Sequence, residues 1–427
     1  MSGCPFHFSR RGFLSALGIA AAAGGAGLGA GIGATAVADA VSGGHGKAEP
    51  FYAAQQGAAH QGGIATPPQS HTYFAAFDLV TDKRDDVIAL LKKWTESSAR
   101  MAKGMPADAI APENAADTHD SGDALGLPPS RLTINIGFGP TFFVKDGKDR
   151  YGLASRRPEA LVDMPAFSGD QLVPEHTGGD MSVQACADDP QVAFHAVRQL
   201  ARLADYTAQI RWTQAGFASS PPDGGTPRNL MGFKDGTVNP ARPDYDKVVW
   251  AGREAPDWMQ GGTYLVARRI RIALEHWDKM KVPFQEQVFG RQKLSGAPLG
   301  GKKEFDIADF NATDADGNSV IAENSHMRLA AAVNNDGAQI LRRAYSYNNG
   351  VNVTAERWPP WREGMEYDAG LLFLCYQRDP RTGFIKIFDK MSKFDIMNQF
   401  VTHVGGGLFA LPRGARQGEF IGQGLFV

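Results

Sequence analysis

Apolar side chains at every second position predict the first strands of the fold. The clearest alternation, with polar residues in between, is formed by Leu132, Ile134, Ile136 and Phe138. Because successive side chains of a strand point to opposite faces, we expect this strand to bury one face. Residues 72–80 predict an earlier core strand, and Thr81 is placed to cap the helix that follows. The apolar face of that helix consists of Val87, Leu90, Leu91, Trp94 and Met101.

The next strand and helix follow the same plan. Alternation from Met181 to Ala185 predicts a strand, and Asp189 then stands at the N-cap of a helix with Pro190 in its first turn. The buried stripe of this helix is expected to be Val192, Ala196, Leu200 and Leu203. The solvated stripe is expected to be His195, Arg198, Gln199 and Arg202. On this pattern His195 lies in solvent and is not a ligand.

The second half of the chain echoes the first. Residues 263–267 (Thr-Tyr-Leu-Val-Ala) are similar to residues 72–76 (Thr-Tyr-Phe-Ala-Ala), and residues 374–380 are similar to residues 185–190 at nearly the same offset. Two echoes at nearly one offset indicate an internal duplication. We therefore expect an α+β fold of duplicated ferredoxin-like units, with antiparallel sheets and helices on the outer faces. The two sheets would close face to face in a barrel-like arrangement and leave a cavity between the halves.

Composition shifts divide the chain into segments. The predicted halves are residues 71–245 and 246–427. Residues 41–70 are rich in Gly, Ala, Gln and Pro and predict a flexible leader. Residues 105–128 predict a surface loop, and residues 289–324, rich in Gly, Lys and Asp, predict a surface insertion.

The first forty residues are expected to be an export signal rather than part of the fold. Paired Arg10 and Arg11 precede an uncharged Ala/Gly-rich run, and residues 38–40 (Ala-Asp-Ala) form a small-residue cleavage pattern. This order is typical of a twin-arginine signal. A plain signal peptide or a membrane anchor is the alternative, but Gly and Ala give the run little transfer free energy. The expected location is the periplasm or another part of the cell envelope, or the extracellular space.

Composition is that of an ordinary globular protein. The chain has 427 residues, of which 43% are hydrophobic and 21% are charged, which is enough for a large core. A formal net charge of −2 gives no reason to expect a nucleic-acid partner. Cys186 and Cys375 lie in apolar runs and are expected to be free core residues. No Cys-x-x-Cys-His sequence occurs, so covalent haem attachment of that kind is excluded.

A stretch near the middle of the chain, residues 229–240, presents an acid between two glycines. Asp235 lies between Gly232 and Gly236, and glycine lets a backbone adopt unusual shapes and approach a ligand closely. The simplest interpretation is a surface turn, because Asp-Gly is a common hairpin signal. The stretch also stands at the junction of the two predicted halves, which favours a functional loop.

Other residues could complete a site. Arg342 and Arg343 lie inside a predicted strand, residues 340–347, so one of them points inward and needs an acid or an anionic ligand. A structural ion pair and a functional site are equal alternatives there. His326 is not singled out from the ten histidines by pattern alone. Asp235, His326 and Arg342 together fit a haem with one axial histidine and with an acid and an arginine over its open face. Zinc, EF-hand, nucleophile-elbow and phosphate-loop patterns are absent from the sequence.

At these residues the chain resembles the dye-decolourising peroxidases, and it is especially similar to their exported deferrochelatase/peroxidase branch. The central match is the family's Gly-x-x-Asp-Gly motif, here Gly232 to Gly236. Further matches are residues 226–231, 237–240, 184–196, 370–373 and the Gly-rich run at 405–407. The resemblance extends from about Ser70 to the C-terminus.

The resemblance implies one non-covalent haem b per chain, held in the C-terminal half by an axial histidine. His326 would be the iron ligand, and Asp235 would be the acid/base that moves a proton between the oxygens of hydrogen peroxide. Arg342 would stabilise the leaving oxygen, and it is preferred to Arg343 because the family's arginine follows an Ile-Leu pair. Further haem contacts are implied for Gly232, Phe233, Lys234, Gly236, Arg328 and Phe373.

The implied reaction reduces hydrogen peroxide and oxidises a small-molecule reductant such as a dye or a phenol. The same branch implies an alternative, in which the protein releases iron from haem or oxidises ferrous iron beside other components of an iron-uptake system. A haem carrier is a third candidate. The hydrogen-bond partner of the axial histidine is left open among Asp395, Asn398 and Gln399, and Gln399 would give the imidazole less anionic character. Whether the protein forms a homo-oligomer is also left open.

Overall fold

The N-terminal half forms a four-stranded antiparallel sheet with two long helices. The computed structural model describes residues 46–53, 59–110, 120–222, 224–355 and 363–427, so the predicted export signal lies outside the described residues. The main elements of this half are β1 (His71–Leu79), α2 (Arg84–Met101), β2 (Thr133–Phe138), α3 (Pro140–Phe143), β3 (Met181–Ala187), α4 (Pro190–Leu203) and β4 (Ala208–Phe217). The strand order β2-β3-β1-β4, with one helix after β1 and one after β3, is the ferredoxin-like arrangement.

The C-terminal half repeats this order as β7-β8-β5-β9. Its strands and main helix are β5 (Thr263–Ile272), β6 (Leu341–Arg342), β7 (Tyr345–Ala355), β8 (Glu363–Gln377), α9 (Phe384–Phe394) and β9 (Val401–Leu411). Short helices precede β5 and fill the connection from β5 to β6: α5 (Tyr245–Val248), α6 (Leu274–Trp277), α7 (Val282–Phe289) and α8 (His326–Ala330). The predicted duplication is confirmed, because the two matched segments lie in β1 and β5, which pair with β3 and β8 in equivalent places.

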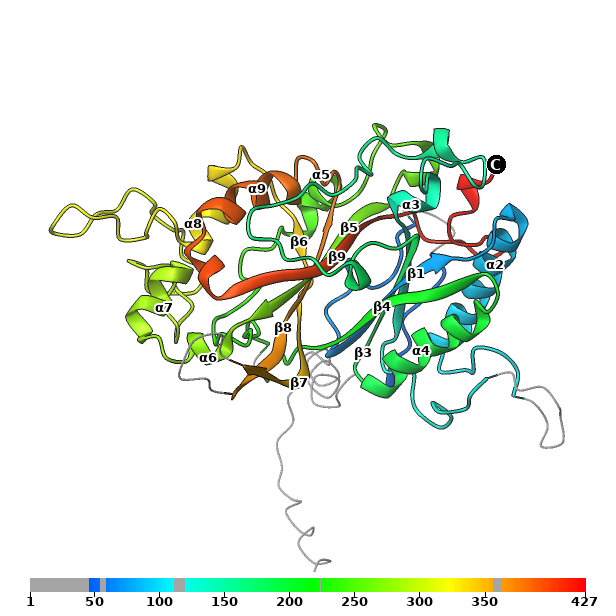
Figure 1. The fold of residues 1–427 in the computed structure, drawn as a ribbon, viewed down its shortest axis with the longest axis horizontal. Helices are drawn as coiled ribbons and strands as arrows, with labels where there is room; N and C mark the ends of the chain where they lie inside the picture. Colours follow the sequence, from blue (N-terminus) through cyan, green and yellow to red (C-terminus); the bar gives the residue numbers. More distant parts are fainter. Residues whose placement is uncertain (1–45, 54–58, 111–119, 223, 356–362) are drawn as a thin grey trace, which may run out of the picture. The chain divides into compact units, whose positions relative to one another are not determined.

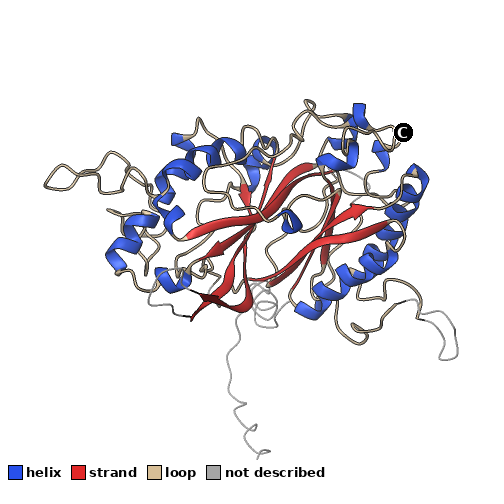
Figure 2. Cartoon of the chain, in the orientation of Figure 1, coloured by secondary structure: helices blue, strands red, loops and turns tan. Residues whose placement is uncertain are grey.

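The two four-stranded sheets are joined along both edges, so together they form one closed barrel. β2 pairs with β9 at Phe138 and Ala410, and β4 pairs with β7 at Phe217 and Ser346. The helices lie outside the strands, with α2 and α4 beside each other on the N-terminal half and α8 and α9 on the C-terminal half (Figures 1 and 2). The expected α+β fold is therefore confirmed. The sheets are joined at their edges, and their inner faces also pack face to face as expected, with the rings of Phe74 on β1 and Phe409 on β9 6.0 Å apart.

Side chains from both halves fill the inside of the barrel. Phe74 and Trp212 of the first half pack in one buried cluster with Leu265, Leu374 and Phe409 of the second. The prediction of a cavity between the halves is therefore wrong for this region. Large aromatic and branched side chains occupy the space because a barrel of about eight strands is just wide enough for side chains to fill it.

The closure also explains why β2 is buried on both faces, although we expected one solvated face. Its polar residues face inward, where Asn135 donates a hydrogen bond to Gln184 on β3 (3.2 Å). Part of the segment predicted as a flexible leader is packed against the same region. The side-chain amide of Gln61 bonds to both the N–H (2.8 Å) and the carbonyl (3.0 Å) of Ile136. This end of the leader therefore lies inside the fold.

The helix starts show one prediction confirmed and one wrong. Asp189 caps α4 as expected, accepting hydrogen bonds from the N–H groups of Gln191 (2.7 Å) and Val192 (3.1 Å). The N-cap of α2 is Lys83 and not Thr81. Thr81 accepts a bond from the Lys83 N–H (3.1 Å) and donates to Asp86 (2.6 Å), so it shapes the turn before the helix.

The predicted strand at residues 340–347 is present as β6 and the start of β7. Both pair with β8 in one continuous register, in which Arg342 lies opposite Cys375 and Tyr345 opposite Leu372. Cys375 and Cys186 are free and buried, as predicted. Within the described residues, no helix is long and apolar enough to cross a membrane.

Candidate functional site

The loop that carries Asp235 has a backbone fixed by its own residues. The Asn229 side chain accepts hydrogen bonds from the N–H groups of Met231 (3.1 Å) and Phe233 (3.2 Å), and the Asp235 N–H donates to the Pro227 carbonyl (2.9 Å). Gly232 and Gly236 have φ angles of +86° and +110°, which L side chains rarely adopt. The segment is therefore a shaped loop, and the simple hairpin turn that Asp-Gly suggested is not formed.

A single carboxylate from the predicted surface insertion ties this loop down. Glu304 pairs with Lys234 and accepts hydrogen bonds from the hydroxyls of Thr226 and Thr237 (3.0 Å for Thr237). Burial works to raise the pKa of Glu304, but these three hydrogen bonds outweigh it and lower the pKa from its ordinary value. Lys234 is thus occupied by Glu304. No periodicity in the insertion pointed to Glu304, which sequence reasoning missed.

Asp235 and Arg342 form an ion pair between the loop and β6. The Asp235 side chain is 14% exposed and that of Arg342 is 31% exposed, so the pair remains in contact with open space. The Arg342 guanidinium lies over the ring of Phe373, with 5.9 Å from Cζ to the ring centroid. A cation on an aromatic face is held in position by the ring quadrupole as well as by its acid. Three of the predicted site residues, Asp235, Arg342 and Phe373, therefore lie in contact with one another through Arg342.

The neighbouring Arg343 is on the opposite face of the strand. It is buried inside the barrel and donates to the Thr66 carbonyl and the Gln69 side chain. Strand alternation therefore separates the two arginines, as expected. The guanidinium of Arg343 donates to neutral oxygens. Its burial therefore requires neither of the two partners that we expected, an acid or an anionic ligand.

His326, the first residue of α8, is bonded to an acid. Its Nδ1 lies 2.7 Å from Asp395 Oδ2, and its side chain is 31% exposed. Asp395 is buried at the end of α9, where its other oxygen accepts the Met397 N–H (2.8 Å). Of the three residues that the sequence left open, Asp395 is thus the partner of His326. Asn398 instead bonds backbone carbonyls at the end of α9, and Gln399 is exposed.

Aromatic rings connect the Asp235 loop to His326. Phe233 is buried and stacks on Phe289, with ring centroids 3.9 Å apart and planes 5° apart. Phe289 in turn lies 6.1 Å from the His326 ring. The same loop therefore places Asp235 beside Arg342 and Phe233 near His326, with only the ring of Phe289 between Phe233 and the histidine. Arg328 lies apart from these contacts, donating to the Ile321 carbonyl (2.8 Å) with its guanidinium over Phe310.

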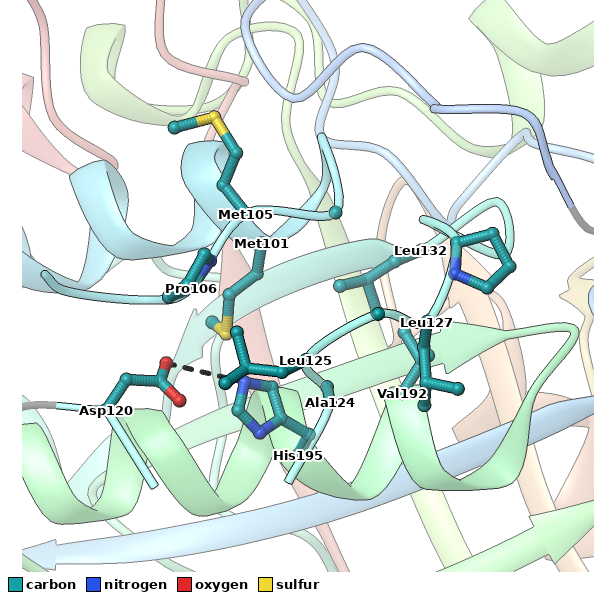
Figure 3. Close-up of a pocket in the computed structure, with 13 residues that line it drawn as sticks. Met101, Met105, Pro106, Asp120, Ala124, Leu125, Leu127, Leu132, Val192 and His195 are labelled. Carbon is teal, nitrogen blue, oxygen red and sulfur yellow. Dashed lines mark ion pairs between the residues drawn. The ribbon is translucent and has the colours of Figure 1, made fainter. Parts of the chain in front are cut away.

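The prediction that His195 lies in solvent is wrong. Its side chain is buried, with Nδ1 2.8 Å from Asp123 and Nε2 3.5 Å from Asp120. Figure 3 shows His195 and Asp120 facing each other in a pocket that Met101 also lines. Residues 120–128 cover this side of α4, which also explains why Gln199 is buried. Among the described residues, no group of three or more His, Cys, Asp or Glu side chains could hold a metal ion.

Comparison with known proteins identifies the family. Two family models match: Dyp-type peroxidase, N-terminal, over residues 61–218, and Dyp-type peroxidase, C-terminal, over residues 226–416. A dye-decolorizing peroxidase of Thermobifida fusca (strain YX) is 39% identical over 98% of this chain and 97% of its own length. A deferrochelatase of Escherichia coli (strain K12) is 34% identical over 88% of this chain and 87% of its own.

A solved structure leads to the same conclusion. Ferric DtpA from Streptomyces lividans is 38% identical, with a TM-score of 0.79 over 90% of this chain and 98% of that chain. Both halves of the fold and the loop between them are therefore shared with relatives of known class. The chain belongs to the Dyp-type peroxidase family and is a haem peroxidase.

Proposed function

We propose that the protein reduces hydrogen peroxide and oxidises dye-like, phenol-like or other one-electron donors in the cell envelope, using one non-covalent haem b per chain. The observation that carries the proposal is the single loop that has Asp235 paired with Arg342 and Phe233 stacked one ring away from the His326–Asp395 pair. An acid–arginine pair and an acid-bonded histidine would together supply the proton transfer, the charge stabilisation and the iron ligand for peroxide chemistry at a haem.

The residues present fit such a haem. His326 uses Nδ1 for Asp395, and no hydrogen bond within the described part of the chain engages Nε2, which is the atom that would hold the iron. Arg342 Nε is buried and has no hydrogen-bond partner among the described residues. Phe373, Gly232 and Gly236 would present a flat apolar or side-chain-free surface to the macrocycle. Arg328, further along α8, would serve a haem carboxylate.

In this mechanism each side chain has one task. When bound, the haem would supply an iron that reacts with peroxide and the capacity to store oxidising equivalents. Asp235 takes the proton from one oxygen of hydrogen peroxide and returns it to the other. Arg342 donates hydrogen bonds to the leaving oxygen as negative charge develops on it. Asp395 accepts a hydrogen bond from the Nδ1–H of His326. This bond makes Nε2, the other ring nitrogen, a stronger electron-pair donor to a metal.

A second candidate function is iron release from haem, or oxidation of ferrous iron, beside other components of an iron-uptake system. The deferrochelatase that is 34% identical to this chain favours it. The same His326 and Asp395 would hold the haem in either case. A homo-oligomer is compatible with both functions.

Substitution of the acid and the arginine tests the main proposal. In Asp235→Ala we expect kcat/KM for hydrogen peroxide to fall about 10²–10⁴-fold, because the proton shuttle is lost. In Arg342→Ala we expect a fall of about 10²–10³-fold. Stopped-flow absorbance measures the rate, and the visible spectrum checks that haem is retained. Exposed Asp316→Ala and Arg253→Ala are the matched controls, and unchanged turnover in both site variants would rule out the mechanism.

Replacement of the acid beside His326 tests the iron ligand. Asp395→Asn keeps the shape of the side chain but removes its charge, so we expect haem affinity to fall about 10–100-fold. Titration of the haem-free protein with haem measures this affinity, and Gln399→Ala is the control for a nearby exposed position. Equal haem affinity in Asp395→Asn and the unsubstituted protein would contradict the assignment of His326.

Product analysis separates the two functions. The peroxidase proposal expects haem to remain intact through many turnovers with peroxide and a phenol. The iron-release proposal expects metal-free porphyrin, detected by its fluorescence, when the haem-loaded protein is held under reducing conditions without peroxide. Formation of metal-free porphyrin without any peroxide turnover would replace the first function by the second.

Export by the twin-arginine route remains a proposal, supported by Arg10 and Arg11 before the Ala/Gly-rich run. Changing both to lysine in the full chain should leave the protein in the cytoplasm of a host that has this route. Immunoblots of cytoplasmic and exported fractions measure the distribution, with Lys47→Arg as the control. Undiminished export of the double variant would refute the proposal.

A further inference from the structure

The backbone of β6 has hydrogen-bonding groups on two sides, and only one side is used by its pairing with β8. β6 pairs with β8, and the Arg343 N–H next to it also points to β8, where it donates to the Leu374 carbonyl (2.8 Å). In an antiparallel sheet, the N–H and C=O of one residue point to the same side, and those of the next residue point to the opposite side. The N–H and C=O of Arg342 therefore point away from β8, toward the edge. On that edge, the described pairing with β4 reaches only Ser346.

One side chain satisfies both groups at this edge. The N–H of Arg342 donates to Asn239 Oδ1 (2.9 Å), and Asn239 Nδ2 donates to the Arg342 carbonyl (2.9 Å). These are the two bonds that an opposing strand residue would make. Asn239 is exposed and lies four positions after Asp235, in a turn where its own N–H donates to the Gly236 carbonyl (3.3 Å).

We propose that Asn239 is a positioning residue that sets the distance between Asp235 and Arg342, an inference that rests on the proposed function of that pair. The short segment from Asp235 to Asn239 contacts Arg342 twice, with a carboxylate on the guanidinium and a carboxamide on the backbone. The ion pair alone fixes only the tip of a flexible side chain. The carboxamide fixes the backbone from which that side chain starts, so loop and strand move together.

The consequence is kinetic. Displacement of a catalytic group by about 1 Å can lower a rate about 10²-fold even when every reacting group is present. Asn239→Ala should therefore lower kcat/KM for hydrogen peroxide about 10–100-fold, while KM for the reducing substrate is unchanged. Asn239→Asp keeps the shape and the acceptor but loses the donor, so it should also lower kcat/KM. Asn311, an exposed asparagine in the insertion, provides the controls Asn311→Ala and Asn311→Asp, which should match the unsubstituted protein.

Two further measurements separate positioning from a general structural effect. In an Arg342→Leu background, Asn239→Ala should have little additional effect on kcat/KM, because Asn239 acts through Arg342. In the haem-free protein, hydrogen exchange at the Arg342 amide, followed by mass spectrometry, should be faster in Asn239→Ala. It should stay slow in Asn239→Asp, which keeps the acceptor, and in Asn311→Ala.

The outcomes distinguish this inference from the function on which it rests. An equal loss from Asn239→Ala with and without the Arg342 side chain overturns it, and so does unchanged exchange at the Arg342 amide. Normal peroxide turnover in both Asp235→Ala and Arg342→Ala, by contrast, overturns the proposed mechanism of that pair, and the exchange result then still reports whether Asn239 holds the strand.

Discussion

The antiparallel pairing of β6 with β8 is the constraint on which the site depends. Strand alternation directs Arg342 outward to Asp235 and Arg343 inward to the barrel, although the two residues are adjacent and chemically identical. A slip of one residue in this register would exchange their positions and leave Asp235 without a partner. The register is stabilised from the inside, because Leu341 and Tyr345 belong to the buried cluster that fills the barrel. Packing of the core therefore decides which arginine is available for chemistry.

The charged groups around the site are arranged in separate pairs. Asp235 faces Arg342, His326 faces Asp395, and Glu304 faces Lys234. Partly buried charges are costly unless each has a partner, so this arrangement lets the loop hold several charges near apolar rings. It also gives each pair a distinct task. The Lys234–Glu304 pair anchors the loop, and the Asp235 side chain pairs with Arg342 on β6.

The sequence predicted the fold further than it predicted the site. Period-two patterns located β2 and β3, and the echo between residues 72–76 and 263–267 revealed the duplication that the structure contains. The polar face of β2 was assigned to solvent because a single strand pattern cannot show that a barrel closes around it. His195 was misplaced for a similar reason, since the loop that covers it is distant in sequence. The sequence narrowed the hydrogen-bond partner of His326 to three residues but could not select Asp395 among them. That selection depends on how the end of α9 packs against α8.

The two halves share a topology, but they differ in the connection after the first strand of each half. In the N-terminal half, β1 leads into the long helix α2, whose Trp94 and Leu91 are fully buried against the sheet. In the C-terminal half, β5 leads into short helices and an insertion, and the five-residue α8 stands beside α9. A short helix covers less of the sheet than a long one. His326 and Arg342 therefore keep about a third of their side-chain surface exposed, and the haem that we propose would bind beside the short helix that carries His326.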